Sequence, residues 1–164
     1  MDAAIESIPL DYGSGKNNII IGQSHFVKTV EDLGEILAAI AGAKYGLAFN
    51  EASGPCLIRT EGNDPALVDA AAVCARAVGA GHTFYIILGP GTFPIHVLDR
   101  VKTCPEVCRV FCATGNPLQV LVARTSQGAG VLGVVDGYAP KGVEGDSDKA
   151  DRKALLRRFG YKFC

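Results

Sequence analysis

The segment NDPALVDAAAVCARAVGAGHTFYIIL, residues 63–88, constrains the fold more than any other part of the chain. Asp64 is a typical N-cap residue, Pro65 suits the first position of a helix, and Gly79 and Gly81 suit its end. The run that follows is apolar and rich in β-branched residues, which is typical of a buried strand. A helix that leads directly into a buried strand predicts an α/β fold.

The rest of the chain alternates strand-like and helix-like segments in the same way. Apolar residues at helical spacing follow Thr29, a candidate N-cap, and Gly42 is suited to end that helix. Further strands are expected over residues 3–10, 18–22, 107–114, 118–125 and 130–138 and as a hairpin within 45–62, and further helices over about 94–102 and 148–159. The order ββα-ββα-βα-βββ-α predicts one compact α/β domain, residues 1–164, with a mixed β-sheet and helices packed on it.

The composition limits the classes of molecule that the protein is expected to bind. Charged residues make up 20% of the chain and the net charge is −1, which gives no long-range attraction to nucleic acid or to acidic membranes. No run approaches the roughly 18 apolar residues of a membrane span, and the acidic N-terminus lacks the features of a signal peptide. We therefore expect a cytoplasmic protein, and its 48% hydrophobic content indicates surface hidden in an oligomer.

The six cysteines are expected to be thiols in a reducing compartment. Cys104, Cys108 and Cys112 are spaced four apart, which would align them on a helix. Pro105 and the β-rich run that follows argue against a helix there, and the spacing of metal ligands is absent. The sequence predicts no metal site, and the cysteines are interpreted as small core residues.

Two glycine-rich segments are candidates for phosphate-binding loops. GSGK, residues 13–16, has one residue between its glycines instead of four and precedes a strand, so it is not a P-loop. SQGAGVLG, residues 126–133, enters a strand. Its backbone amides would be able to approach a phosphate, but a turn with close backbone packing is the favoured interpretation.

Two histidines are candidates for a functional role. His82 lies between a glycine-lined helix end and a strand, with room for a ligand and the Thr83 hydroxyl beside it. His25 lies in a loop between a strand and a helix, where polar groups often meet ligands. A lone histidine more often satisfies a buried backbone group, and that alternative stays open for both. His96, inside a short helix, is expected to be structural.

Polar side chains also follow several of the expected strands. Ligands in α/β proteins bind beyond strand ends, so these groups together with His82 predict one convergent pocket. The alternative is that they belong to ordinary turns, which favour the same residue types. The groups are Asn50, Glu51 and Ser53, then Thr114 and Asn116, then Asp136, Tyr138, Lys141 and Glu144.

Several motifs resemble those of one known family. HFVKTVEDL, GLAFNEASG, GAGHTF, VCRVFCATGNP, GVLGVVDGYAPKGVE and RRFGYKF together resemble the adenosine-specific kinase family, found mostly in archaea and some thermophilic bacteria. The resemblance runs from about Gly22 to Phe163. It implies a compact α/β fold, a homo-oligomer (trimer or hexamer), and binding of adenosine or AMP in preference to ADP or ATP. It also implies a stably phosphorylated histidine.

The resemblance places the phosphohistidine at His82, with His25 as the alternative. Such a residue acts as nucleophile and later as leaving group, which splits phosphoryl transfer into two steps. Donors to the phosphoryl oxygens would be Thr83, glycine amides, and Lys28 or Lys141. Glu51 or Asp136 would bind ribose, and Tyr138, Phe93 and Asn116 the adenine. The expected nucleotide-binding set is His25, Asn50, Glu51, Ser53, Gly81, Thr83, Phe93, Thr114, Asn116, Asp136, Tyr138 and Lys141.

Three hypotheses follow from these observations. The first is a phosphotransferase that acts on adenosine through phospho-His82. The second is a module that binds or senses AMP without chemistry, which the lack of a P-loop favours. The third is a subunit whose pocket is shared between chains of an assembly. The phosphoryl donor, a requirement for Mg²⁺ and any cofactor besides the adenosine or AMP ligand stay open.

Overall fold

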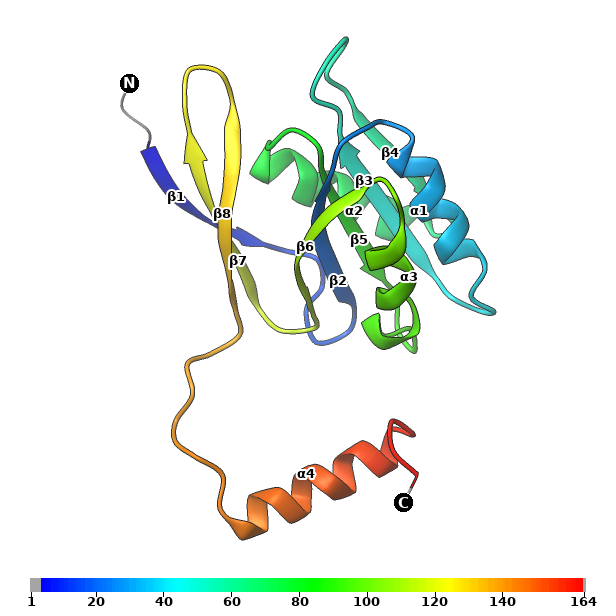
Figure 1. Cartoon of the computed structure of the whole chain (residues 1–164), viewed down its shortest axis with the longest axis vertical. Helices are drawn as coiled ribbons and strands as arrows, with labels where there is room; N and C mark the ends of the chain where they lie inside the picture. The colour runs from blue at the N-terminus through cyan, green and yellow to red at the C-terminus, as the bar shows by residue number, and fades with distance from the viewer. Residues whose placement is uncertain (1–3, 164) are drawn as a thin grey trace.

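The computed structural model describes residues 4–163, which form two antiparallel β-sheets and four α-helices (Figure 1). The element order is the predicted one, with a short 3₁₀-helix added before α3. Ala3, part of the first expected strand, lies outside the described residues. The elements are β1 (Ala4–Leu10), β2 (Asn18–Ser24), α1 (Thr29–Ala38), β3 (Tyr45–Asn50), β4 (Ile58–Gly62), α2 (Pro65–Val78), β5 (Thr83–Leu88), η1 (Pro94–His96), α3 (Leu98–Thr103), β6 (Val107–Thr114), β7 (Leu118–Arg124), β8 (Ala129–Asp136) and α4 (Asp146–Arg158).

The larger sheet has the strand order β4-β3-β5-β2-β6, and the smaller has the order β1-β7-β8. The predicted α/β class with helices on a sheet is confirmed, but the strands pair antiparallel in two sheets instead of one mixed sheet. The reason lies in the crossovers. Each of α1, α2 and α3 joins two parallel strands that have one antiparallel strand between them, so β2 and β3 flank β5, β4 and β5 flank β3, and β5 and β6 flank β2.

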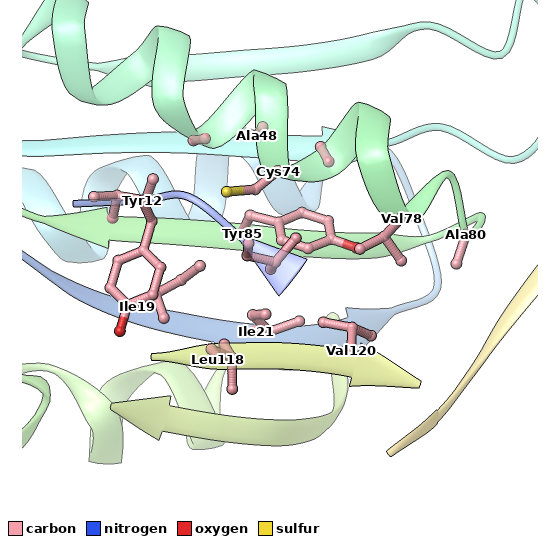
Figure 2. Packing of buried hydrophobic residues seen from close by; sticks show 14 of the residues in the cluster. Tyr12, Ile19, Ile21, Ala48, Cys74, Val78, Ala80, Tyr85, Leu118 and Val120 are labelled. Carbon is pink, nitrogen blue, oxygen red and sulfur yellow. The ribbon is translucent and has the colours of Figure 1, made fainter. Parts of the chain in front are cut away.

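The five-stranded sheet is buried on both faces. Ile20 and Ile86 point toward α1 and α3, whereas Ile19, Ile21 and Ile87 point toward α2 and the three-stranded sheet. In Figure 2, side chains from α2, β2, β5 and β7 meet in this second core. Each fully buried residue of this size contributes about 1.5–3 kcal/mol to folding, so the two cores hold the strand ends rigidly.

Both ends of α2 are fixed by the residues that the sequence singles out. The Asp64 carboxylate accepts hydrogen bonds from the backbone N–H groups of Ala66 and Leu67 at 3.1 and 3.3 Å. Gly79 ends the helix in the left-handed conformation, with φ of 62°. This predicted helix is therefore confirmed, and the chain runs from its end directly to His82, the residue before β5.

The caps of α1 differ from the expected ones. Lys28 occupies the N-cap position without a side-chain hydrogen bond, and the helix ends at Ala38 instead of near Gly42. The Thr29 hydroxyl donates to the carbonyl of Phe26 at 2.6 Å, so it is engaged in the preceding turn. Among residues 4–163, none of the helices combines the length and the apolar character that crossing a membrane requires.

Residues 137–163 form an arm that leaves the body of the protein at the end of β8 (Figure 1). Its helix α4 has no buried residue among those described. The ring of Tyr161, beyond α4, lies edge-on to the ring of Phe93 with 6.4 Å between centroids. The arm therefore touches the body through aromatic residues near its end and extends away from it elsewhere.

Candidate functional site

The predicted site residues lie at two opposite ends of the five-stranded sheet. Pairing across β2 shows the separation, because Gln23 is opposite Thr83 at one end and Ile19 is opposite Thr114 at the other. Four residues of strand separate the ends by about 13 Å. Within one chain, the single convergent pocket is thus divided into an Asn50 end (Asn50, Gly81, His82, Thr83) and an Asp136 end (Thr114, Asn116, Asp136).

At the Asn50 end, a buried amide joins three segments of the chain. Asn50 Nδ2 donates to the carbonyls of Ala75 and Ala80 at 3.0 and 3.1 Å and lies 3.2 Å from the Thr83 hydroxyl. The Thr83 hydroxyl donates to Ala80 at 2.6 Å and lies 3.1 Å from the hydroxyl of Tyr85. Buried polar groups are nearly always paired in this way, and here the pairing fixes the end of α2 against β3 and β5.

His82 has an unusual backbone conformation, with φ of 59°. This left-handed conformation costs a residue with a side chain about 1–2 kcal/mol. Two hydrogen bonds hold it: the His82 N–H donates to Asn50 O at 2.7 Å, and Ser24 N–H donates to His82 O at 2.9 Å. The half-buried imidazole stacks on Phe49, with 5.8 Å between ring centroids and 19° between planes. Strained residues held by their surroundings are concentrated at functional sites.

A cleft of about 740 Å³ opens beside Gly81 at the same end. Three segments surround it: the end of α2, the loop between β3 and β4, and the β7–β8 hairpin. Asn50, Glu51 and Gly81 are the predicted site residues that line it, whereas His82 is not among the lining residues. The cleft is lined by Asn50, Glu51, Ala52, Cys56, Ile58, Ala75, Arg76, Gly79, Gly81, Ala123, Thr125, Gln127, Gly128, Ala129 and Gly130.

The wall formed by the β7–β8 hairpin was not expected to belong to the site. Its sequence signal is the glycine-rich segment 126–133, a pattern that by itself favours a plain turn. The parallel bridge between Ala80 and Ala129 explains its position, because it joins the start of β8 to the segment before His82. Arg76, on the last turn of α2, is a further lining residue that no sequence pattern indicates.

Glu51 is the acidic group of the cleft. Its carboxylate accepts from the backbone N–H of Leu57 at 3.1 Å and from the Arg59 guanidinium at 3.0 and 3.1 Å. The Leu57 N–H and the Arg59 charge together hold the pKa of Glu51 below its usual value. Glu51 is therefore an ionised acceptor next to the carbonyl end of α2, and both features favour a ligand that donates hydrogen bonds.

His25 belongs to a separate group of charges. Its Nε2 lies 2.6 Å from the Glu106 carboxylate, which also contacts Lys28 Nζ at 3.0 Å. Glu106 is buried, and Lys28 also pairs with Asp32 at 2.5 Å. A carboxylate bonded to one ring nitrogen fixes the orientation of an imidazole. None of these residues lines the cleft.

The Asp136 end is a closed hydrogen-bond network. The Asp136 carboxylate accepts from the Thr114 hydroxyl at 2.7 Å and from Asn116 Nδ2 at 3.0 Å. The Tyr12 hydroxyl donates to the carbonyl of Asn116. Burial, followed by the charge of Asp136, raises the pKa of Tyr12 to about 12. These contacts join the two sheets.

The remaining predicted residues lie outside both groups. Ser53 is exposed in the β3–β4 loop, and Tyr138 and Lys141 are exposed on the arm. Phe93 is part of the aromatic contact with the arm, and its backbone N–H donates to Nδ1 of His96 at 3.2 Å. Within residues 4–163, no three His, Cys, Asp or Glu side chains are grouped so that they could hold a metal ion.

Comparison with known proteins places these features in context. A family model described as "Adenosine specific kinase" matches residues 10–162. The chain is also similar to the crystal structure of PH1918 protein from Pyrococcus horikoshii OT3, with 42% identity and a TM-score of 0.92 over 99% of this chain and 100% of that one. Among curated proteins, none matches the chain significantly.

Proposed function

Because the chain belongs to the adenosine-specific kinase family, we propose that it binds adenosine or AMP in the cleft beside Gly81 and transfers a phosphoryl group through His82. The observation that carries the proposal is the conformation of His82, a strained residue fixed by hydrogen bonds to Asn50 and Ser24. Gly81, its neighbour in the chain, lines the cleft. The strained backbone conformation of His82 is explained if the function requires the imidazole at that position.

The chemistry of the cleft suits a nucleoside. Its volume of about 740 Å³ lies in the range of small-molecule sites. Adenosine presents ribose hydroxyls and an exocyclic amine as donors, and Glu51 and the carbonyl end of α2 are acceptors. The partially negative C-terminal end of α2 disfavours a ligand of high negative charge, and Arg76 is the cation of the lining that can pair with a single phosphate. A preference for adenosine or AMP over ADP or ATP is consistent with this polarity.

The proposed transfer takes two steps. In the first, one imidazole nitrogen of His82 attacks the phosphorus of a phosphorylated donor, an N–P bond forms, and the donor oxygen leaves with the bonding electrons and takes the proton of the other imidazole nitrogen. In the second, the adenosine 5′-hydroxyl oxygen attacks the same phosphorus, the N–P bond breaks, and the released nitrogen accepts the hydroxyl proton. The product is AMP, and His82 returns to its starting state.

A non-catalytic module that binds or senses AMP is the second candidate function. The observation that favours it is the position of the imidazole, which stacks on Phe49 and does not line the cleft. The two functions differ in one measurable property. The phosphotransferase forms phosphohistidine, whereas the binding module does not.

Intact-mass spectrometry under neutral conditions and after mild acid tests the proposal, because phosphohistidine is labile to acid. We expect the wild type to gain one acid-labile phosphate from a phosphoryl donor, and His82→Asn to gain none while it still binds adenosine by calorimetry. His25→Asn and His96→Asn are the matched controls and should gain phosphate. Phosphate on His82→Asn would refute the role of His82. Adenosine binding without any phosphate on the wild type would establish the binding module.

A further inference from the structure

Another pocket, of about 590 Å³, lies between the end of α1 and the segment that follows β5. His82 precedes β5, whereas the pocket lies past its other end, and a strand of this length spans about 17 Å. The pocket shares no lining residue with the cleft beside Gly81. The function proposed above therefore leaves it without a role.

Thr92 is the buried polar residue of this pocket, with 5% of its surface exposed. Its carbonyl accepts from Asn18 Nδ2 at 3.2 Å, which fixes its backbone. Its hydroxyl makes no hydrogen bond to residues 4–163, yet Arg59 Nε is the only fully enclosed unpaired side-chain atom of that range. The hydroxyl must therefore open into the pocket. Buried hydroxyls are normally paired, so this one is available to a ligand.

His96 and Arg100 add two further donors to the same pocket. Nδ1 of His96 accepts from the backbone N–H of Phe93 at 3.2 Å, so the ring proton is on Nε2, which can donate. Arg100 also lines the neighbouring groove, but within residues 4–163 neither acid of that groove, Asp32 or Glu35, pairs with it. The guanidinium is thus free to bind an anion.

The charge balance of the pocket favours a ligand with one negative charge. Among the described residues that line it, none is Asp or Glu. The end of α1 contributes about half a negative charge, and Arg100 contributes a full positive one. The sum is positive but small, so a monoanion is favoured over a dianion. The rest of the lining is largely apolar and includes Ile40, Ala41 and Pro90.

We propose that this pocket binds a small organic carboxylate. The two carboxylate oxygens accept from the Arg100 guanidinium, which matches a carboxylate in a bidentate pair. The Thr92 hydroxyl and Nε2 of His96 donate to the remaining lone pairs. The apolar part of the ligand lies against Ile40 and Pro90. The volume of about 590 Å³ is in the range of small-molecule sites.

Saturation-transfer NMR of the full chain, with benzoate as the probe, tests the proposal without adenosine. We expect a dissociation constant of about 1 mM for a ligand of this size. Arg100→Gln and Thr92→Val should each weaken benzoate binding about tenfold, the effect of losing a hydrogen bond to a charged group. Lys102→Gln is the matched control, because it removes the same charge from an exposed residue of α3 outside the pocket. Circular dichroism confirms that each variant is folded.

Two further probes with the same ring test the charge preference. Benzylamine, a cation, should not bind, and phenyl phosphate, a dianion, should bind more weakly than benzoate. AMP should not displace benzoate, because the cleft beside Gly81 is lined by other residues.

Several results would overturn the carboxylate site. They are a wild type that does not bind benzoate, equal binding of benzylamine, tighter binding of phenyl phosphate, or unchanged affinity in Arg100→Gln or Thr92→Val. Displacement of benzoate by AMP would place benzoate in the adenosine cleft and would also overturn it. A wild type that binds benzoate as expected but binds no adenosine or AMP would refute the proposed function and leave the carboxylate site intact.

Discussion

At the Asn50 end of the five-stranded sheet, the polar groups surround an open cleft, and His82 is held in a strained conformation beside it. At the Asp136 end, the same types of polar residue bond to one another. Both ends carry Asn and Thr side chains. The types of residue are therefore similar, and what distinguishes the Asn50 end is the cleft that Asn50 and Glu51 line.

The comparison shows how a candidate ligand site can be distinguished from a group of similar residues with a structural role. Asn50 donates to backbone carbonyls, which fixes the rim of the cleft, and Glu51, whose carboxylate accepts from Leu57 N–H and from Arg59, lines the same cleft. Asn116 instead donates to Oδ1 of Asp136, which also accepts from the Thr114 hydroxyl. Substitutions at matched positions of the two ends should thus have unequal effects on binding and stability.

The largest effect is expected for Asn50→Ala compared with Asn116→Ala. Asn50→Ala removes a buried donor from the carbonyls of Ala75 and Ala80 and should lower the free energy of unfolding by about 2–3 kcal/mol. Asn116→Ala removes one exposed contact to Asp136, which keeps Thr114, and should cost less than about 1 kcal/mol. Urea denaturation measures both. Equal losses would show that the two ends are equivalent structural networks.

The next effect concerns the two carboxylates. Glu51→Gln weakens an acceptor in the cleft and should reduce adenosine affinity about tenfold, the effect of losing one charge-assisted hydrogen bond. Asp136→Asn, at the other end, should leave the affinity as it is in the wild type. Isothermal titration calorimetry provides both values. Reduced binding in Asp136→Asn alone would move the ligand site to the Asp136 end.

His82 allows the strain to be measured separately from the chemistry. Both His82→Gly and His82→Ala remove the imidazole and should abolish phosphoryl incorporation. Glycine adopts the left-handed conformation freely, so His82→Gly should be about 1–2 kcal/mol more stable than His82→Ala. Thermal denaturation compares the two. If the two variants have equal melting temperatures, the backbone at this position relaxes once the imidazole is removed, and the strain is small.

The elements were largely predictable from local sequence signals. Helix α2 is an example, because Asp64, Pro65 and Gly79 act within the helix itself and their effect does not depend on the rest of the fold. The strand β5 was predicted from its apolar run in the same way. The direction of strand pairing could not be predicted from the local sequence, because each crossover leaves room for a strand from elsewhere in the chain.

The site was predictable only in part for the same reason. Asn50, Glu51 and Gly81 come together because β3 ends where β5 begins, and both ends carry small or polar residues. Thr114 and Asp136 also follow strands, but the antiparallel order sends them to the opposite end of the sheet. The hairpin wall depends on the bridge between Ala80 and Ala129, a contact between distant segments that no local pattern encodes.

The smallest effect is expected for Tyr12→Phe at the Asp136 end. Losing the hydrogen bond to the Asn116 carbonyl should cost about 0.5–1 kcal/mol at neutral pH. In the wild type, the pKa of Tyr12 rises from 10.0 to about 12 on folding, so the folded protein keeps this proton after the unfolded chain has lost it. That contribution to stability is complete below pH 10 and disappears as the pH rises to about 12.

Phenylalanine cannot ionise, so the Tyr12→Phe variant should lose stability less steeply than the wild type over the same pH range. Urea denaturation at intervals from neutral to alkaline pH measures the two slopes. A variant that declines as steeply as the wild type would mean that Tyr12 does not titrate in this range, and the closed network at the Asp136 end would then be less buried than its contacts indicate. A shallower decline would show that the Tyr12 hydroxyl is shielded from water, although Asp136 and Asn116 beside it are exposed.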